Sequence, residues 1–270
     1  MFLKKLFPAS VKDEMKRRLA TKILGFGDAF PSFSHCGEDR VLAYLFKKFP
    51  TGSFVDVGAF HPQTSSNTFL LYQRGWRGVN IDALPGAMEL FKRMRPDDVN
   101  LELAISSREE ILTYYKIGDR PHEMNGFSLE FQSNLYADYG IKESDVREIP
   151  IRARPLSAVL DEHLPAGRSI ELLTIDVEGM ELQVLASNNW EKYRPVVVMT
   201  EHHQEMTAET YGLPTLRFLE AQNYRLICKL PNELIFLRRD FQLTKSGMIA
   251  PPRHGETAAR LVPRDGPSRG

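Results

Sequence analysis

The chain has 270 residues, of which 42% are hydrophobic and 26% are charged, a composition typical of globular proteins. Lys+Arg and Asp+Glu both total 35, so the net charge is zero and the charge balance gives no sign of a nucleic-acid partner. The two cysteines, Cys36 and Cys228, are too few for a disulfide framework and are not spaced for zinc, so we expect reduced thiols in a cytoplasmic protein.

The N-terminal segment, residues 1–30, has the pattern of a basic amphipathic helix. Val11, Met15, Leu19 and Ile23 recur at helical spacing, with lysines and arginines between them. Charges interrupt its apolar runs, so it is a poor signal peptide, and no stretch of the chain reaches the roughly 20 apolar residues of a membrane span. Three roles stay open for this arm: packing on its own domain, contact with an anionic membrane surface, and binding of a partner.

Strand-like and helical patterns alternate along residues 31–245, which predicts an α/β domain. The strand-like runs are 53–57, 78–81, 99–105, 170–175, 196–200, 224–228 and 234–237, and the helical patterns are 67–74, 86–94, 156–163, 180–187 and 215–222. This order predicts a mostly parallel sheet with helices on both faces. The polar turn KLPNE joins the last two runs into an antiparallel hairpin, as in the class I methyltransferase (Rossmann-like) fold.

Two segments depart from the alternation. Residues 116–150 are long, polar and aromatic, and we interpret them as a lid or substrate-binding insert, with a plain structural excursion as the alternative. Residues 246–270 end the chain, and the last twenty are rich in Pro, Gly and Arg, which predicts a disordered tail.

The first strand-like run ends in a turn suited to a cofactor. In FVDVGAFHP, Asp56 and Gly58 follow the strand, and Gly58 lets the backbone turn sharply and approach a ligand. The polar stretch through Asn67 then leads to a helix N-terminus, whose free N–H groups favour an anion such as a carboxylate.

The second strand-like run ends in Asp82, which is well placed to accept both hydroxyls of a ribose. A site with one glycine, a ribose-binding acid and no G-x-G-x-x-G serves a pyrophosphate poorly. S-adenosylmethionine has a ribose, a sulfonium and an amino-acid end without phosphate, so the turn and Asp82 together predict this cofactor. The alternatives are a plain turn at Asp56 and a helix cap at Asp82.

Two later strands deliver acids and imidazoles to the same edge of the sheet. LLTIDVEGMEL places Asp176 and Glu178 after one strand, and VVVMTEHH places Glu201 and His202 after the next. These four are candidate catalytic residues, because carboxylates and imidazoles at the end of a cofactor pocket can act as general bases toward an acceptor. In a second mechanism Asp176, Glu201 and His202 bind Mg²⁺ or a similar ion, which lowers the pKa of the acceptor group.

Five motifs in order carry a family resemblance: SHCGEDRVL, FVDVGAFHP, SSNTFLLYQRGWRGVNIDA, LLTIDVEGMELQVL and RPVVVMTE. Together they resemble the FkbM family of S-adenosylmethionine-dependent methyltransferases over roughly residues 34–201. The resemblance implies a class I methyltransferase fold and methyl transfer, usually to oxygen. It also implies acceptors that are hydroxyls of sugars, glycans or polyketide-type natural products.

Carried over by position, the resemblance implies a set of cofactor-binding residues. These are Glu38 near the methionine end or the acceptor, Asp56, Gly58 and Ala59 under the cofactor, Asp82 at the ribose and Ser106 beside the adenine, with Asn67, Ala83 and Asp176 as further cofactor-binding residues. The chain departs from the family at His35, where Gln is frequent, and has Phe60 where many methyltransferases have a second glycine. The latter narrows the expected approach to the cofactor.

The sequence therefore predicts an S-adenosylmethionine-dependent O-methyltransferase acting on a sugar hydroxyl of a glycan or glycolipid. A polyketide-type or other small natural product is the alternative acceptor. Two rivals of other classes are a nicotinamide oxidoreductase, which the missing glycines disfavour, and a non-catalytic cofactor-binding domain. The basic arm would suit a membrane-attached acceptor and a cytoplasmic enzyme that touches the membrane surface.

Overall fold

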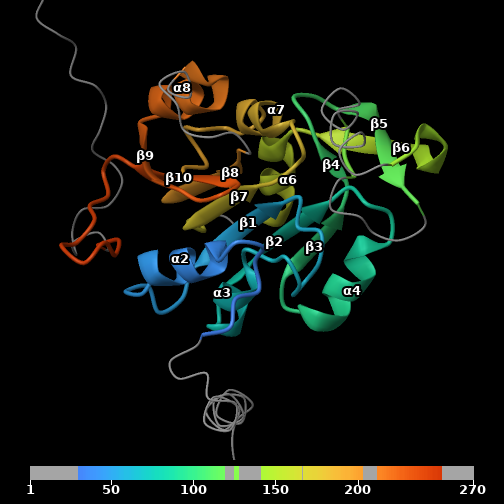
Figure 1. Ribbon diagram of the computed structural model, residues 1–270. Coiled ribbons are helices and arrows are strands. Elements are labelled where there is room, and N and C mark those ends of the chain that lie inside the picture. Colours follow the sequence, from blue (N-terminus) through green and yellow to red (C-terminus); the bar gives the residue numbers. More distant parts are fainter. Residues whose placement is uncertain (1–29, 119–124, 128–140, 166, 203–211, 251–270) are drawn as a thin grey trace, which may run out of the picture. The chain divides into compact units, whose positions relative to one another are not determined.

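The protein is described from a computed structural model of the chain (Figure 1). The residues described are 30–118, 125–127, 141–165, 167–202 and 212–250. The chain divides into two units, Met1–Ser32 and Phe33–Gly270, and the second contains the sheets and the helices that cover them. The predicted basic arm and most of the predicted insert lie outside the described residues.

A seven-stranded sheet forms the centre of the second unit, with strand order β3-β2-β1-β7-β8-β10-β9. All neighbours pair in parallel except β10, which is antiparallel to both β8 and β9, as the hairpin at KLPNE predicts. The strands are β1 (Ser53–Val57), β2 (Arg77–Asp82), β3 (Val99–Glu102), β7 (Leu172–Ile175), β8 (Val197–Glu201), β9 (Tyr224–Lys229) and β10 (Glu233–Arg238).

Helices cover both faces of this sheet. One core cluster joins strand residues such as Val55 and Phe236 to helices α6 (Leu156–His163), α7 (Glu181–Ala186) and α8 (Pro214–Ala221). A second cluster joins Phe54 and Met199 to α2 (Glu38–Leu45) and α3 (Phe69–Gln73). Because both faces are covered, β1 and β7 are buried along their whole length, which explains their continuous apolar runs.

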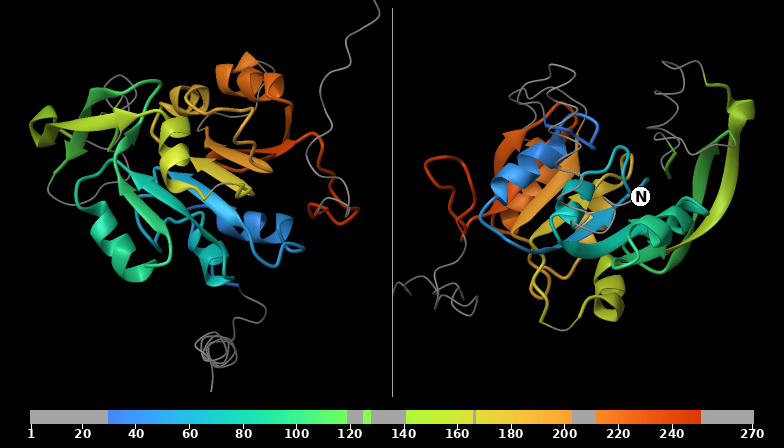
Figure 2. Two further views of the ribbon diagram at one scale, coloured as in Figure 1. Left: turned by 180° about the vertical axis from the view of Figure 1, so that it is seen from behind. Right: turned by 90° about the horizontal axis from the view of Figure 1, so that it is seen from below.

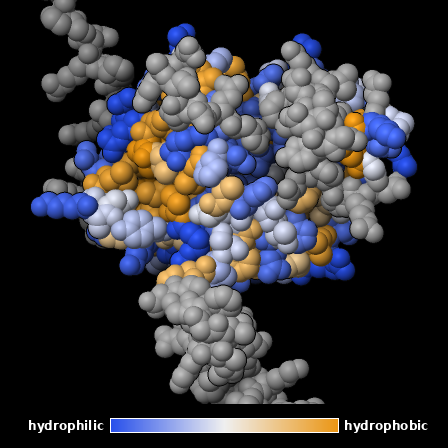
Figure 3. Space-filling model, viewed as in Figure 1, coloured by the Kyte–Doolittle hydropathy of each residue, from blue (hydrophilic) through white to orange (hydrophobic). Residues whose placement is uncertain are grey.

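The remaining helix, α4 (Ala87–Met94), connects β2 to β3 and buries Met88 and Phe91 against Ala59. The surface view in Figure 3 shows apolar side chains gathered over the α2 and β10 side of the unit. None of the helices in the described ranges is long and apolar enough to cross a membrane.

A second, three-stranded sheet was not predicted. Its order is β4-β6-β5, with β4 (Ala104–Ile105) parallel to β6 (Val146–Arg154) and β5 (Glu110–Ile117) antiparallel to β6. Figure 2 shows the long β5–β6 ribbon projecting from the main sheet. The expected insert therefore begins and ends within these two strands, and its predicted role as a lid remains a prediction.

The predicted strand 99–105 is two strands that belong to different sheets. β3 pairs with β2 only as far as Asp82 and Glu102, where β2 ends. After Leu103 the chain has lost that partner, and Ala104 and Ile105 pair with β6 instead. The segment resembles one strand in the sequence because Val99, Leu101 and Leu103 pack against the core and Ala104 and Ile105 are buried, although the two strands lie in different sheets.

One helix was missed and one boundary needs correction. The α2 helix, which begins at Glu38 within the motif SHCGEDRVL, was not predicted. The predicted tail starts too early, because Ile249 is fully buried and its N–H donates to the Leu45 carbonyl at 2.9 Å. The packed domain therefore extends to residue 250.

Candidate active site

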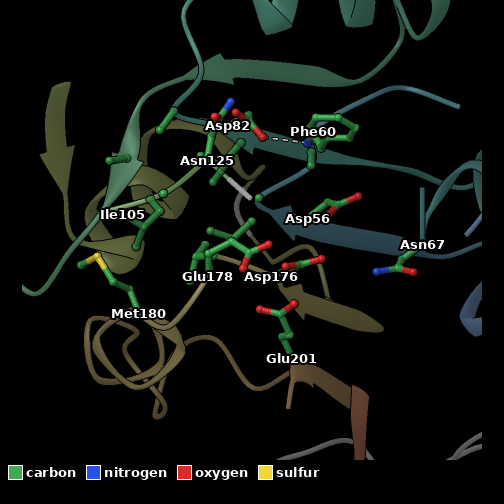
Figure 4. Close-up of a pocket in the computed structure, with 18 of the residues that line it drawn as sticks. Asp56, Phe60, Asn67, Asp82, Ile105, Asn125, Asp176, Glu178, Met180 and Glu201 are labelled. Carbon is green, nitrogen blue, oxygen red and sulfur yellow. Dashed lines mark hydrogen bonds between the residues drawn. The ribbon is translucent and has the colours of Figure 1, made fainter. Parts of the chain in front are cut away.

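A pocket of about 380 Å³ lies at the carboxyl ends of the parallel strands (Figure 4). Ligands bind at this edge in open α/β sheets. We call the part formed by the ends of β1 and β2 the cofactor half. We call the part formed by Asp176, Glu178, Glu201 and Glu233 the carboxylate half.

Gly58 sets the shape of the turn after β1. Its φ is +83°, and a Cβ placed on it would lie 1.6 Å from the backbone oxygen of Asp176. The N–H groups of Gly58 and Ala59 donate to the Ile81 carbonyl at 2.9 and 3.1 Å. The turn is thus fixed between β2 and β7, and glycine is required both for its left-handed backbone and for the close approach.

Phe60 stands where many methyltransferases have a second glycine, and Asp82 holds its backbone in the left-handed conformation. Phe60 adopts a left-handed φ of 50°, and its N–H donates to Oδ2 of Asp82 at 2.7 Å. Oδ1 of Asp82 accepts from the Leu84 N–H, also at 2.7 Å. Burial raises the pKa of Asp82, and these two N–H groups oppose that rise. Since a carboxylate offers about four acceptor positions, Asp82 retains capacity for two ribose hydroxyls.

Asp56 lies beneath the turn and is held by a buried arginine that the sequence did not reveal. Arg95 has no exposed surface, and its guanidinium donates to the Pro62 carbonyl, Ser66 Oγ, Thr68 Oγ1 and Asn80 Oδ1 at 2.7 to 3.2 Å. The Thr68 hydroxyl donates in turn to Asp56 at 2.6 Å. Burial raises the pKa of Asp56 to about 6, although the Thr68 hydrogen bond and the Arg95 charge lower it.

Arg95 therefore links the segment between β1 and α3, through Pro62 and Ser66, to Asn80 of β2. Nothing in the sequence pattern marks it, because a basic residue at the end of an amphipathic helix ordinarily faces solvent.

The carboxylate half brings three acids together. Oxygen atoms of Asp176, Glu178 and Glu201 lie within 4.8 Å of one another, and Figure 4 shows these side chains converging. The pKa of Asp176 is raised well above its usual value, first by burial and then by the charges of Glu201 and Glu233. Such a carboxyl group accepts a proton more readily near neutral pH than an exposed one.

Glu233 is a fourth acid of this half that the sequence pattern did not indicate. It pairs directly with Glu201 across β8 and β10. Met199 and Ile235, two residues along each strand, belong to the core cluster under α2, so both glutamates point to that face. Glu233 is 4% exposed, and burial with the charges of Glu201 and Glu38 raises its pKa well above the usual value. Glu233 is the last residue of the turn KLPNE, and glutamates in turns ordinarily face solvent, so the pattern did not indicate that it is buried.

The second sheet closes the pocket opposite the carboxylate half. Asn125 and Gly126 fold back onto β5, where Oδ1 of Asn125 accepts from the Ile117 N–H at 2.8 Å. Tyr115 and Gly126 exchange backbone hydrogen bonds. Nδ2 of Asn125 is buried on the pocket wall and has no hydrogen-bond partner among the described residues. It is a donor available to a ligand beside Asp82 (Figure 4).

Most of the predicted site residues line this one pocket. Those on its wall are Glu38, Asp56, Gly58, Ala59, Asn67, Asp82, Ala83, Asp176, Glu178 and Glu201.

Two predicted residues are placed elsewhere. The Ser106 hydroxyl donates to Glu110 at 2.6 Å, which joins the end of β4 to β5. The His202 N–H donates to the Asn232 carbonyl at 2.6 Å, and this residue is not among those on the wall. The group of acids that could hold a metal therefore contains Glu178 in place of His202.

The sheet order, with one antiparallel strand next to the last, and a pocket at the ends of β1 and β2 define a class I methyltransferase. The family model for the methyltransferase FkbM domain matches residues 56–226, more than half of the chain. The protein belongs to the FkbM family and is an S-adenosylmethionine-dependent methyltransferase. The pocket fits this cofactor, because the carboxylate of Asp82 and the unpartnered Nδ2 of Asn125 offer an acceptor and a donor for a nucleoside.

Several solved structures share low similarity with the chain. A precorrin-6y C5,15-methyltransferase from Geobacter metallireducens is 10% identical, over 74% of this chain and 86% of that one, with a TM-score of 0.38. A TehB-like methyltransferase from Corynebacterium glutamicum is 11% identical over 85% and 97%, with a TM-score of 0.37. An O-methyltransferase from Bacillus cereus is 8% identical over 87% and 93%, with a TM-score of 0.37. No curated protein sequence matches the chain.

Proposed function

We propose that the protein methylates a hydroxyl group, most readily one on a sugar of a glycan or glycolipid. The observation that supports this is the group of acids Asp176, Glu178 and Glu201 at the end of the pocket beyond the cofactor half. A hydroxyl needs a proton acceptor before it attacks, and a positioned base contributes typically 10²–10⁴-fold to the rate. A polyketide-type alcohol is the alternative acceptor.

In this mechanism the pocket aligns the acceptor oxygen with the methyl carbon. The bound cofactor would supply the methyl group, on a sulfonium that is already electrophilic, and Asp176 or Glu201 would take the proton that the acceptor hydroxyl releases. Alignment alone contributes up to roughly 7–11 kcal/mol in favourable cases.

A second mechanism uses the same acids to hold Mg²⁺ or a similar ion. Carboxylate oxygens are the ligands that hard divalent cations prefer, and the separation of at most 4.8 Å among three such oxygens suits one ion. The ion would bind the acceptor hydroxyl and lower its pKa. Loss of methyl transfer on treatment with a chelator, and its return on adding Mg²⁺, would favour this mechanism over a protein base.

The direct test is transfer of a labelled methyl group from S-adenosylmethionine to a panel of monosaccharides, oligosaccharides and polyketide-type alcohols. We expect an O-methylated sugar as product, identified by nuclear magnetic resonance. Transfer only to nitrogen, or binding of NADH in place of S-adenosylmethionine, would contradict the proposal.

We also propose that the enzyme acts in the cytoplasm and that the basic arm, residues 1–30, rests on an anionic membrane surface. The alternating apolar and basic residues of the sequence support this. Changing Lys12, Lys16, Arg17 and Arg18 to Glu should abolish binding to vesicles that contain phosphatidylserine. Equal binding by the altered and original proteins would exclude the membrane role.

A further inference from the structure

The pocket wall carries far more negative than positive charge. Among the described residues on it there is no lysine or arginine, and histidine occurs once, as His35. The acids on the wall are Glu38, Asp56, Asp82, Asp176, Glu178, Glu201 and Glu233. Asp56 and Asp82 belong to the cofactor half, where a hydroxyl and two backbone N–H groups hydrogen-bond to them. The excess of charge therefore lies in the carboxylate half and beside it at Glu38.

Glu233 is the acid of this half with the clearest need for a ligand. It is more than nine-tenths buried, and its Oε2 atom has no hydrogen-bond partner among the described residues. The nearest cation is Lys229, but its ammonium group donates to the carbonyls of His202 and Pro231. A buried carboxyl group next to other carboxyl groups is costly unless a cation or a proton neutralises it.

S-adenosylmethionine does not remove this excess. The cofactor has one net positive charge, from its sulfonium, ammonium and carboxylate groups, whereas Glu38, Asp176, Glu178, Glu201 and Glu233 are five acids. A divalent ion at Asp176, Glu178 and Glu201 would also leave Glu233 aside, since it is not a member of that group. Protons or a further cation must neutralise the rest, and the acceptor is a molecule that can bring a cation.

We infer that the acceptor carries an ammonium group and that Glu233 binds it, together with Glu201 across β8 and β10. This inference rests on the proposed function and names its substrate class: an amino sugar or another hydroxyl compound with an amine. The same wall repels phosphate groups. The reaction that supplies the acceptor must therefore have removed any phosphate or nucleotide before methyl transfer takes place.

The inference can be tested by binding, without turnover. The protein is saturated with S-adenosylhomocysteine and titrated calorimetrically with glucosamine, N-acetylglucosamine and glucosamine 6-phosphate. We expect glucosamine to bind at least about tenfold more tightly than the other two, the lower end of what a charge-assisted hydrogen bond contributes. Glu233→Gln should remove this preference and leave the affinity for S-adenosylhomocysteine unchanged. Glu191→Gln, at an exposed position, controls for the loss of one charge.

Three results would overturn the inference. The first is equal or weaker binding of glucosamine compared with N-acetylglucosamine. The second is weaker S-adenosylhomocysteine binding in Glu233→Gln, which would assign Glu233 to the cofactor ammonium. The third is tight binding of Mg²⁺ alone that depends on Glu233. Thermal unfolding checks that Glu233→Gln is folded. Methylation of a neutral sugar, with no preference for amines, would also overturn this inference but would leave the proposed function intact.

Discussion

The two halves of the pocket are built on opposite principles. In the cofactor half each acid has partners inside the protein: Asp56 accepts from Thr68, and Asp82 accepts from two backbone N–H groups. In the carboxylate half burial and the nearby charge of Glu201 raise the pKa of Asp176 and of Glu233, and Glu233 has a buried oxygen without a partner among the described residues. The acids of the cofactor half are thus hydrogen-bonded within the protein, whereas Glu233 of the carboxylate half keeps a buried oxygen that a ligand can pair.

This difference teaches where mutations should separate binding from chemistry. Preorganised hydrogen bonds set the affinity for a ligand that does not react at them. Groups that await a proton or a charge act on the reacting atoms and change kcat. Substitutions in the two halves test that division, beginning with the largest expected effect.

Removing a proton acceptor from the carboxylate half should abolish most of the methyltransferase activity. We expect Glu201→Gln and Asp176→Asn to lower kcat by about 10²–10⁴-fold, the usual contribution of a general base. Calorimetry should show that Glu201→Gln, at a residue not assigned to the cofactor, keeps its S-adenosylhomocysteine affinity within a few-fold of the original. Full activity of both variants would remove these residues from the mechanism.

Removing Arg95 should destabilise the cofactor half. Arg95→Met leaves Asp56 buried without its nearby cation, and breaking such a buried charge arrangement costs roughly 3–5 kcal/mol of unfolding free energy. Urea unfolding measures the loss. Arg93→Met, an exposed position on the same helix, is the matched control and should change the free energy of unfolding little. Similar effects of both substitutions would refute the role of Arg95.

The raised pKa of Asp56 should make stability depend on pH. Burial raises that pKa from 3.8 to about 6, so the folded protein binds the proton more tightly than the unfolded chain. Stability contributed by the protonated form is lost as pH rises from about 4 to above 6, by about 3 kcal/mol in all. Asp56→Asn should lose this part of the slope, whereas Asp97→Asn, at an exposed site, should retain it. Parallel curves for Asp56→Asn and the original protein would contradict the assignment.

Replacing Asp82, the acid expected to bind the ribose, should weaken cofactor binding, and this effect should be smaller than those above. Asp82→Ala loses hydrogen bonds to a charged group worth roughly 1.5–3 kcal/mol, which is about 10- to 100-fold in the Kd of S-adenosylmethionine. Calorimetric titration measures it, with NADH as a ligand that neither protein should bind. An unchanged Kd would place the ribose elsewhere in the pocket.

The sequence by itself determined the fold class, the family and the residues at the ends of β1 and β2 that line the pocket. Apolar runs specify buried parallel strands because burial on both faces leaves no alternation, and Gly58 and Asp82 follow those runs directly. Both are local signals, readable from the residues at the end of one strand.

Only the tertiary structure decided the neighbours of these residues. Arg95, at the end of α4, hydrogen-bonds to Thr68, which lies 27 residues earlier in the chain. Glu233 lies beside Glu201 because β10 pairs with β8 in the antiparallel direction. Asn125 packs on β5 of the second sheet. That sheet includes Ala104 and Ile105, which pair with β6 because β2 ends at Asp82. Such contacts depend on strand order and register, which fix distances between residues far apart in the chain, and no local pattern in the sequence encodes them.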